Sequence, residues 1–278
     1  MEKKHRRDWL SPILRAGVWT AMILTVGTLV MIIAYILIMG VPHLKLSLFS
    51  PTYTSENASM LPSILNTLWV ILVSLGISVP LGIGCAIYLA EYTKRDSFVV
   101  RIIRMAAETL SGIPSIVYGL FGYLFFVAQL KWGYSLLAGS CTLSLMILPL
   151  IMRTTEEALL SVPDSYREGS LALGAGKLRT VMKVVLPPAS GGIFAGIILA
   201  TGRIVGETAA LIYTAGTVAK IALNPMSSGS TLAVHVYVLS GEGLHVGEAY
   251  ATAVVLMVIV FLMNALSSWI AKRCNRNS

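Results

Sequence analysis

The sequence predicts an all-α integral membrane protein with six membrane-spanning helices. Hydrophobic residues make up 56% of its 278 residues and charged residues only 12%, whereas an average soluble domain is about 25% charged. The mean hydropathy is +0.78. About 20 apolar residues in a helix cross a membrane core about 30 Å thick. Six apolar stretches have the required length: about 17–40, 62–90, 111–130, 134–152, 188–214 and 249–271.

The first apolar stretch follows a basic segment and must be distinguished from a signal peptide. A secretory apolar region is about 7–15 residues long and precedes a small-residue cleavage site. Here the run 17–39 ends at Gly40-Val41-Pro42 without such a site. We therefore expect a retained span, one transmembrane domain over 17–271, and cytoplasmic segments at 1–16 and 272–278.

The positive charges predict the orientation. If the N-terminus is cytoplasmic, the inner segments 1–16, 91–110, 153–187 and 272–278 hold 17 of the 21 Lys and Arg residues. The outer segments hold three, and Arg203 lies within a span. Cytoplasmic loops of membrane proteins carry this excess of basic residues. The net charge of +8 therefore indicates topology and not nucleic-acid binding, and both termini are expected in the cytoplasm.

The fifth stretch carries small residues at four-residue spacing, which allow helices to approach closely. They are Gly192, Gly196 and Ala200, followed by Gly202 and Gly206. Two interpretations remain open: packing within the bundle, or contact with a second subunit.

A short glycine-rich segment, 173–178, has the outline of a phosphate-binding loop but not its requirements. A P-loop needs a Gly five residues before its Gly-Lys pair and a Ser or Thr after the Lys, and these positions are Leu171 and Leu178. We therefore expect a chain that is not an enzyme and binds no cofactor. The odd, scattered cysteines Cys85, Cys141 and Cys274 form no recognisable metal site.

The segment 153–187 predicts two short helices between the fourth and fifth spans. Asp164 can cap the first helix, and Gly174 can end it with a left-handed turn. A second amphipathic helix would run to Val185, and Pro187 suits the first turn of the next span. Such helices could dock into a partner protein or lie on lipid headgroups.

The pattern Glu168-x5-Gly174-x9-Val184-x-Leu186-Pro187 resembles the EAA loop of binding-protein-dependent ABC importer permeases. The resemblance implies the type I (MetI-like) architecture, with coupling helices seated in ATPase subunits that bind ATP and Mg. The residues carried over for coupling are Glu168, Gly169, Ser170, Gly174, Leu186 and Pro187. Gly169 and Ser170 stand where the family prefers two alanines.

Three further segments, 108–122, 202–211 and 231–237, are similar to the PstA-type permeases of phosphate ABC importers. The similarity runs from about residue 60 to the end of the chain. It implies a pathway for inorganic phosphate, half of it formed by this chain. The implied partners are a PstC-type permease, two copies of a PstB-type ATPase and a PstS-type phosphate-binding protein in the inner membrane complex.

Arg203 is the candidate for contact with the transported ion. A charge within a span is costly unless it faces protein or water, and Glu207 lies at i+4 on the same helix face and can pair with it. The pair could be structural, or Arg203 could bind the oxyanion through its planar guanidinium. We assign Arg203, Glu207 and Thr208 to the substrate pathway.

Other polar residues have less specific signals. His235 and His245 are expected to be surface residues of the outer segment, in which the stretch 227–239 is expected to form a short helix on the outer face. Glu91 and Glu108 are expected to be solvated or paired with the neighbouring basic loop. The side-chain amide of Asn66 and the hydroxyl of Thr67 are expected to form hydrogen bonds with nearby backbone.

Three alternative functions remain open from the sequence. The chain could serve sulfate, molybdate or another oxyanion, because selectivity can reside in the binding protein. It could be a membrane sensor or scaffold that reports phosphate status. An ion-coupled secondary transporter is less consistent, because the sequence shows no internal repeat or coupling-ion site.

Overall fold

The computed structural model describes residues 10–93 and 97–276, and all regular structure in these ranges is helical. The basic residues at 3, 4, 6 and 7, the loop residues Lys94 and Arg95, and the last two residues of the predicted tail lie outside the described residues. The α-helices, in chain order, are α1 (Leu10–Gly40), α2 (Leu61–Ile87), α3 (Phe98–Ser111), α4 (Ser115–Gly122), α5 (Leu136–Leu160), α6 (Asp164–Ala172), α7 (Lys177–Thr180), α8 (Leu186–Val205), α9 (Ala209–Thr214), α10 (Leu232–Glu242) and α11 (Val246–Arg276). Short 3₁₀ segments are Val41–His43 and Leu46–Phe49, and π segments are Tyr88–Tyr92, Tyr123–Gln129 and Val181–Val185.

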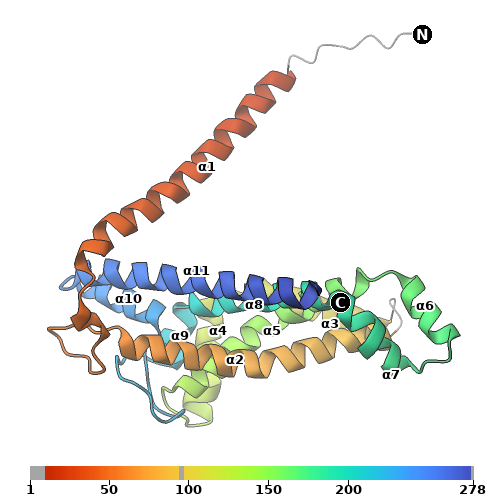
Figure 1. Cartoon of the computed structure of the whole chain (residues 1–278). Coiled ribbons are helices and arrows are strands. Elements are labelled where there is room, and N and C mark those ends of the chain that lie inside the picture. Colours follow the sequence, from red (N-terminus) through yellow and green to blue (C-terminus); the bar gives the residue numbers. More distant parts are fainter. Residues whose placement is uncertain (1–9, 94–96, 277–278) are drawn as a thin grey trace.

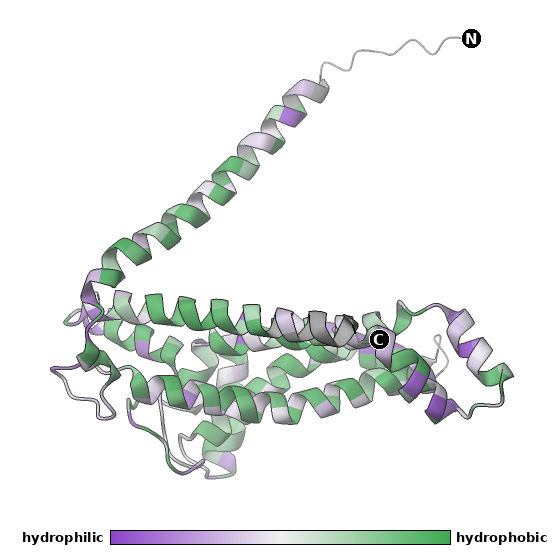
Figure 2. Ribbon diagram, in the orientation of Figure 1, coloured by the Kyte–Doolittle hydropathy of each residue, from purple (hydrophilic) through white to green (hydrophobic). Residues whose placement is uncertain are grey.

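The long helices α2, α5, α8 and α11 lie side by side in a bundle (Figure 1). The helices α6 and α7 project from one end of it, and α10 lies at the opposite end with the loop that follows α1. The helix α1 diverges from the bundle and contacts it mainly through its last turn, where Gly40 meets the backbone of Tyr250 on α11. Apolar residues cover the long helices along their length, whereas polar residues gather at the two ends (Figure 2).

Five helical segments are long and apolar enough to cross a membrane, and a sixth span is present if the bent pair Phe98–Ser111 and Ser115–Gln129 counts as one. This agrees with the six predicted stretches in number, although several bounds differ. The fourth span continues to Leu160 instead of ending near 152. The predicted fifth span 188–214 is broken, because α8 ends at Val205 and α9 begins at Ala209.

The bend in the third span follows from its sequence. The two helices meet at 100° around Gly112-Ile113-Pro114. Pro114 lacks an N–H and disfavours helical backbone in the residue before it. The Tyr118 hydroxyl donates a hydrogen bond of 2.9 Å to the carbonyl of Leu110 and so ties α4 back to α3 across the bend.

The contact between α2 and α5 is made by small polar residues. Ser74 donates to the carbonyl of Ser140 at 3.1 Å, and Ser144 donates to the carbonyl of Ser74 at 3.3 Å. A Cβ added at Gly82 would lie 2.9 Å from the Ile151 side chain. Small residues of this kind let membrane helices approach closely.

The glycine stripe of the fifth span packs inside the bundle for half of its length. A Cβ at Gly192 would lie 2.6 Å from the Ala158 Cβ, and one at Gly196 would meet the Thr154 hydroxyl. Both contacts are with α5, so the bundle-packing interpretation holds for these two residues. Gly202, in contrast, has no atom within 4 Å of an added Cβ.

The segment after α9 is held by the start of α2. Asn66 donates to the carbonyls of Lys220 and Ser230 and accepts from the Ala222 N–H. Thr67 accepts from the Leu232 N–H at the start of α10. The expectation of local backbone bonds is therefore wrong for Asn66, whose partners lie more than 150 residues away in the sequence.

His235 does not lie on the surface as expected. The predicted outer helix is present as α10, but it packs against α11 and α2, and His235 is only 2% exposed. Its ring packs edge-on against Tyr53 and its Nε2 lies 3.4 Å from the Ala58 carbonyl. Burial lowers the pKa of His235 below its usual value, because the charged form is poorly solvated there.

Candidate functional site

Arg203, Glu207 and Thr208 lie at the break between α8 and α9. Arg203 occupies the last turn of α8, and Gly206 is its C-cap residue. Thr208 is the N-cap residue of α9, and its hydroxyl makes no capping hydrogen bond. Glu207 takes that role instead, since its Oε1 accepts a hydrogen bond of 3.1 Å from the Ala210 N–H. The break thus brings the three predicted pathway residues together in one short segment.

The expected pairing of Arg203 with Glu207 is wrong. The expectation required a helix that continues through position 207, and α8 ends two residues earlier. In the part of the chain that the structure describes, the two side chains form no ion pair within 4.0 Å. Arg203 is exposed and Glu207 is half-buried. The charge on Arg203 is therefore available to a ligand or to another subunit.

A cavity of about 740 Å³ opens beside Arg203, between α5, α8 and α11. Most of its lining is apolar. The polar lining residues are Arg203, Asn264 and Ser268. The neighbouring Gly202 has no side chain, and no atom lies within 4 Å of the position that its Cβ would take. A guanidinium offers an anion several charge-assisted hydrogen bonds, and none of the residues that line this cavity is acidic.

The position of α9 is fixed by close packing against α4 and α5. A Cβ at Gly119 would lie 2.8 Å from the Ala210 Cα, and one at Gly139 would lie 2.9 Å from Leu211. At Gly122 an added Cβ would meet Thr142 and Thr214. The helix break is therefore held rigidly, although its own residues form few side-chain contacts.

The loop that resembles the coupling loop forms a defined turn at Gly174. Asp164 is the first residue of α6 and not its cap, since Pro163 occupies the N-cap position. At the other end, Gly174 adopts φ +81°. Its N–H donates to Leu171 and the next N–H, of Ala175, donates to Ser170. This pair of bonds is the Schellman motif, which needs a left-handed residue and therefore favours glycine.

The surface of α6 is open to a partner. None of its residues is buried, and Glu168 and Gly169 are exposed. Its Ser170 hydroxyl bonds to the Thr180 hydroxyl at 2.9 Å and so connects α6 to α7. Large apolar side chains on this end of the protein are also exposed: Tyr166, Leu171, Leu173, Leu178 and Met182.

The second predicted helix is not separate from the fifth span. One continuous helix runs from Lys177 to Val205, with the π segment Val181–Val185 just before Pro187. A proline clashes with the carbonyl four residues before it and offers no N–H, and a π turn relieves both constraints. Leu186 and Pro187 are half-buried at this junction. α7 is therefore continuous with α8.

Sequence reasoning missed one ion pair that joins this loop to the bundle. Arg167 of α6 contacts Glu91, in the π segment after α2, with Nη2–Oε1 at 2.7 Å. The two side chains are only 15% and 6% exposed. The hydrogen bond to Glu91 raises the pKa of Arg167 above its usual value. The expectation that Glu91 would be solvated or paired with its own basic loop is therefore wrong.

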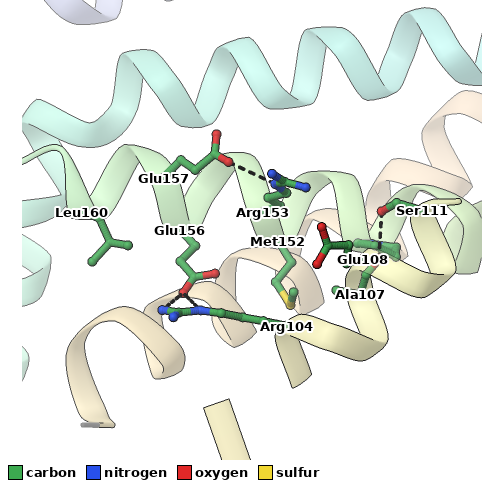
Figure 3. Close-up of a pocket in the computed structure, with 10 residues that line it drawn as sticks. Arg104, Ala107, Glu108, Ser111, Met152, Arg153, Glu156, Glu157 and Leu160 are labelled. Carbon is green, nitrogen blue, oxygen red and sulfur yellow. Dashed lines mark hydrogen bonds and ion pairs between the residues drawn. The ribbon is translucent and has the colours of Figure 1, made fainter. Parts of the chain in front are cut away.

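A second cavity, of about 290 Å³, lies between α3 and α5 and is drawn in Figure 3. Arg104 reaches across from α3 to the Glu156 carboxylate of α5, at 2.5 Å from Nη2 and 2.8 Å from Nε. Glu156 is 8% exposed. Arg153 and Glu157 form a more exposed pair on α5, and Glu108 lies beside the same cavity. The Arg104–Glu156 pair fixes α3 against α5 at the end of the bundle that carries α6.

The comparisons with known proteins agree with this architecture. The family model described as "Binding-protein-dependent transport system inner membrane component" matches residues 78–276. The chain is 37% identical over 262 residues to the probable ABC transporter permease protein YqgI of Bacillus subtilis, covering 87% of this chain and 88% of that protein. It is 38% identical over 178 residues to the phosphate transport system permease protein PstA of Pasteurella multocida, covering 63% of each.

The match to PstA thus spans less than two thirds of that relative. Among solved structures, a chain of the MetNI methionine ABC transporter superposes with a TM-score of 0.62 at 21% identity, covering 77% of this chain and 93% of that chain. This likeness supports the fold alone, and it confirms the expected MetI-like architecture. Since the family model covers most of the chain, the protein belongs to the inner membrane components of binding-protein-dependent transport systems, the permease family of ABC importers.

Proposed function

We propose that this chain is the PstA-type permease subunit of an ATP-driven importer and forms half of the pathway for inorganic phosphate. The observation that carries the proposal is the exposed Arg203 at the helix break, inside the region matched by the family model and beside a mostly apolar cavity. Arginine presents a planar fork of donors that fits phosphate oxygens. The relatives named PstA support phosphate as the substrate.

The chain is proposed to work in a complex. A PstC-type permease would form the other half of the pathway, and a PstS-type protein would deliver phosphate. Two PstB-type ATPase subunits would bind ATP and Mg, and this chain would hold no cofactor of its own. The exposed face of α6, which carries Glu168 and Gly169 and continues to Ser170, is the proposed contact with an ATPase subunit. Gly174, Leu186 and Pro187 are proposed to pass its movement into α8.

The orientation is proposed from charge together with geometry. The excess of Lys and Arg in the segments around α3, α6 and α7 favours the cytoplasm for that end of the bundle. The helix α10 and the loop after α1 lie at the opposite end (Figure 1). Both termini would then be cytoplasmic, and α6 would face the ATPase subunits.

The function is tested by reconstituting the full complex with its cognate partners in proteoliposomes. We expect ATP-dependent uptake of phosphate that a tenfold excess of sulfate or molybdate leaves unchanged. Uptake of sulfate or molybdate instead would assign the chain to another oxyanion. Phosphate binding without any ATP-dependent uptake would contradict the transport proposal and favour a sensor.

The orientation predicts which surface residues can be labelled from outside. Leu223 and Leu173 are 93% and 90% exposed and lie in the segments assigned to opposite sides. In a background in which Cys85, Cys141 and Cys274 are replaced by Ser, Leu223→Cys should react with an impermeant thiol reagent in spheroplasts. Leu173→Cys should react only after the membrane is permeabilised. The reverse pattern would overturn the orientation.

A further inference from the structure

The ion pair between Arg167 and Glu91 joins two parts of the chain that are far apart in sequence. Glu91 lies at the end of the second span, and Arg167 lies on α6, 76 residues later. The Arg167 Nε lies 3.0 Å and 3.2 Å from the two Glu91 oxygens, and Nη2 lies 2.7 Å from Oε1. This arrangement holds the guanidinium in one orientation, because both nitrogens point to the same carboxylate.

The remaining donors of Arg167 are also used. Nη2 donates to the Leu159 carbonyl at 2.8 Å, and Nη1 donates to the Val162 carbonyl at 2.7 Å and to Asp164 at 3.2 Å. Leu159 lies in the last turn of α5, where carbonyls lack an i+4 partner, and Val162 lies two residues after the helix ends. All five N–H groups of one side chain therefore bind acceptors, and they connect α6 to the ends of α2 and α5.

No apolar packing replaces this connection. None of the residues of α6 is buried, and the helix packs chiefly on α7 and on the π segment Val181–Val185. The start of α7 is tied to the same end of α2, since the Lys177 ammonium lies 5.1 Å from the centre of the Tyr92 ring. The principal direct link from α6 to α2 and α5 is consequently the Arg167 side chain.

We propose that Arg167 and Glu91 form a rigid connection through which movement of α6 is transmitted to the second and fourth spans. The proposal rests on the proposed function, in which an ATPase subunit moves α6. Without the pair, α6 would still meet the ATPase but would turn independently of the spans. Arg167 and Glu91 are thus positioning residues for coupling and do not contact the transported ion.

The test measures ATP hydrolysed per ion imported by the full complex in proteoliposomes. Glu91→Gln removes the charge and keeps the shape. We expect an assembled complex that still hydrolyses ATP, with uptake at least tenfold lower and the ratio of ATP to imported ion raised by a similar factor. The matched control is Arg153→Gln with Glu157→Gln, an Arg–Glu pair on α5 whose side chains are 61% and 65% exposed, and its ratio should remain that of the wild type.

A covalent link provides the second measurement. Glu91→Cys combined with Arg167→Cys, in the background without native cysteines, leaves no stranded charge and should also be uncoupled. Joining the two thiols with a short bifunctional reagent should restore uptake several-fold, because it re-creates the connection. A pair exchanged by Glu91→Arg and Arg167→Glu should not recover, since a carboxylate cannot donate to the carbonyls of Leu159 and Val162.

Three outcomes would overturn the proposal. The first is a wild-type ratio of ATP hydrolysed to ion imported for Glu91→Gln, and the second is no recovery of uptake after the double cysteine variant is cross-linked. The third is failure of both Glu91→Gln and the double cysteine variant to assemble, which would assign the pair to folding. The ratio is defined for whichever ion the wild-type complex imports. A wild-type complex that imports sulfate therefore rejects the proposed substrate and still tests the connection.

Discussion

Arg203→Gln is expected to lower phosphate uptake per assembled complex about 10- to 100-fold while the complex still assembles. A hydrogen bond to a charged group contributes about 1.5–3 kcal/mol, and each 1.4 kcal/mol corresponds to a factor of ten. Assembly should survive because Arg203 is exposed and has no ion pair with Glu207 that the substitution would break. The measurement is ATP-driven uptake of labelled phosphate, normalised to the amount of purified complex.

Two further variants separate the role of Arg203 from that of its neighbours. Arg203→Lys keeps the charge but loses the planar fork of donors, so uptake should be intermediate. Glu207→Gln keeps the cap of α9, because a Gln oxygen can still accept from the Ala210 N–H, and we expect a smaller loss of uptake than in Arg203→Gln. This second variant compares the loss of a negative charge with the loss of a positive charge at the same helix break.

The opposite pattern would favour a structural role. If Arg203 served only to stabilise the assembly, Arg203→Gln would reduce the yield of complex, and the complexes that did form would transport normally. Uptake close to that of the wild type from assembled Arg203→Gln complexes would rule out direct contact with the anion.

Much of the fold could be predicted because long apolar runs have one stable arrangement in a membrane. A span without its backbone hydrogen bonds satisfied is too costly in lipid, so the number and approximate places of the helices follow from composition. The break at Gly206 could not be predicted in the same way. It depends on close packing of Gly119 and Gly122 against α9, which is a tertiary contact and leaves the apolar pattern of the fifth span unchanged.

The parts of the candidate site that could be predicted are those formed by residues close together in the sequence. The glycine turn at Gly174 follows from local spacing, and the structure confirms its left-handed backbone. The pair of Arg167 with Glu91 joins residues 76 positions apart, and no local pattern indicates such a contact. One signal was available: a charged residue at the very end of an apolar span, such as Glu91, requires a partner if it is buried.

The same separation explains why His235 was placed wrongly. A helix between two polar segments outside the membrane has no apolar run that would indicate burial. In the structure α10 is covered by α11 and by the segment that includes Tyr53 and Ala58. Its burial results from contacts made by residues nearly 180 positions earlier in the chain.

Gly174→Val is expected to reduce transport about tenfold or more in a complex whose membrane spans are intact. Gly174 adopts φ +81°, a conformation that costs an L-residue about 1–2 kcal/mol and is worse for a β-branched one. No atom lies within 4 Å of an added Cβ, so the effect is confined to the backbone. Loss of the left-handed turn would break the bonds that end α6 and would displace the proposed contact with the ATPase.

Gly176→Val is the matched control, two residues further along the same loop. Gly176 has φ −69° and ψ 155°, a conformation that valine adopts readily, and its added Cβ would also meet no atom within 4 Å. We therefore expect near wild-type uptake from Gly176→Val and, for Gly174→Val, both lower uptake and weaker retention of the ATPase during purification. Equal uptake by the two variants would show that the turn at Gly174 is not needed for coupling. Equal loss in both would assign the effect to the valine side chain on the docking surface, because only one of the two positions has a strained backbone.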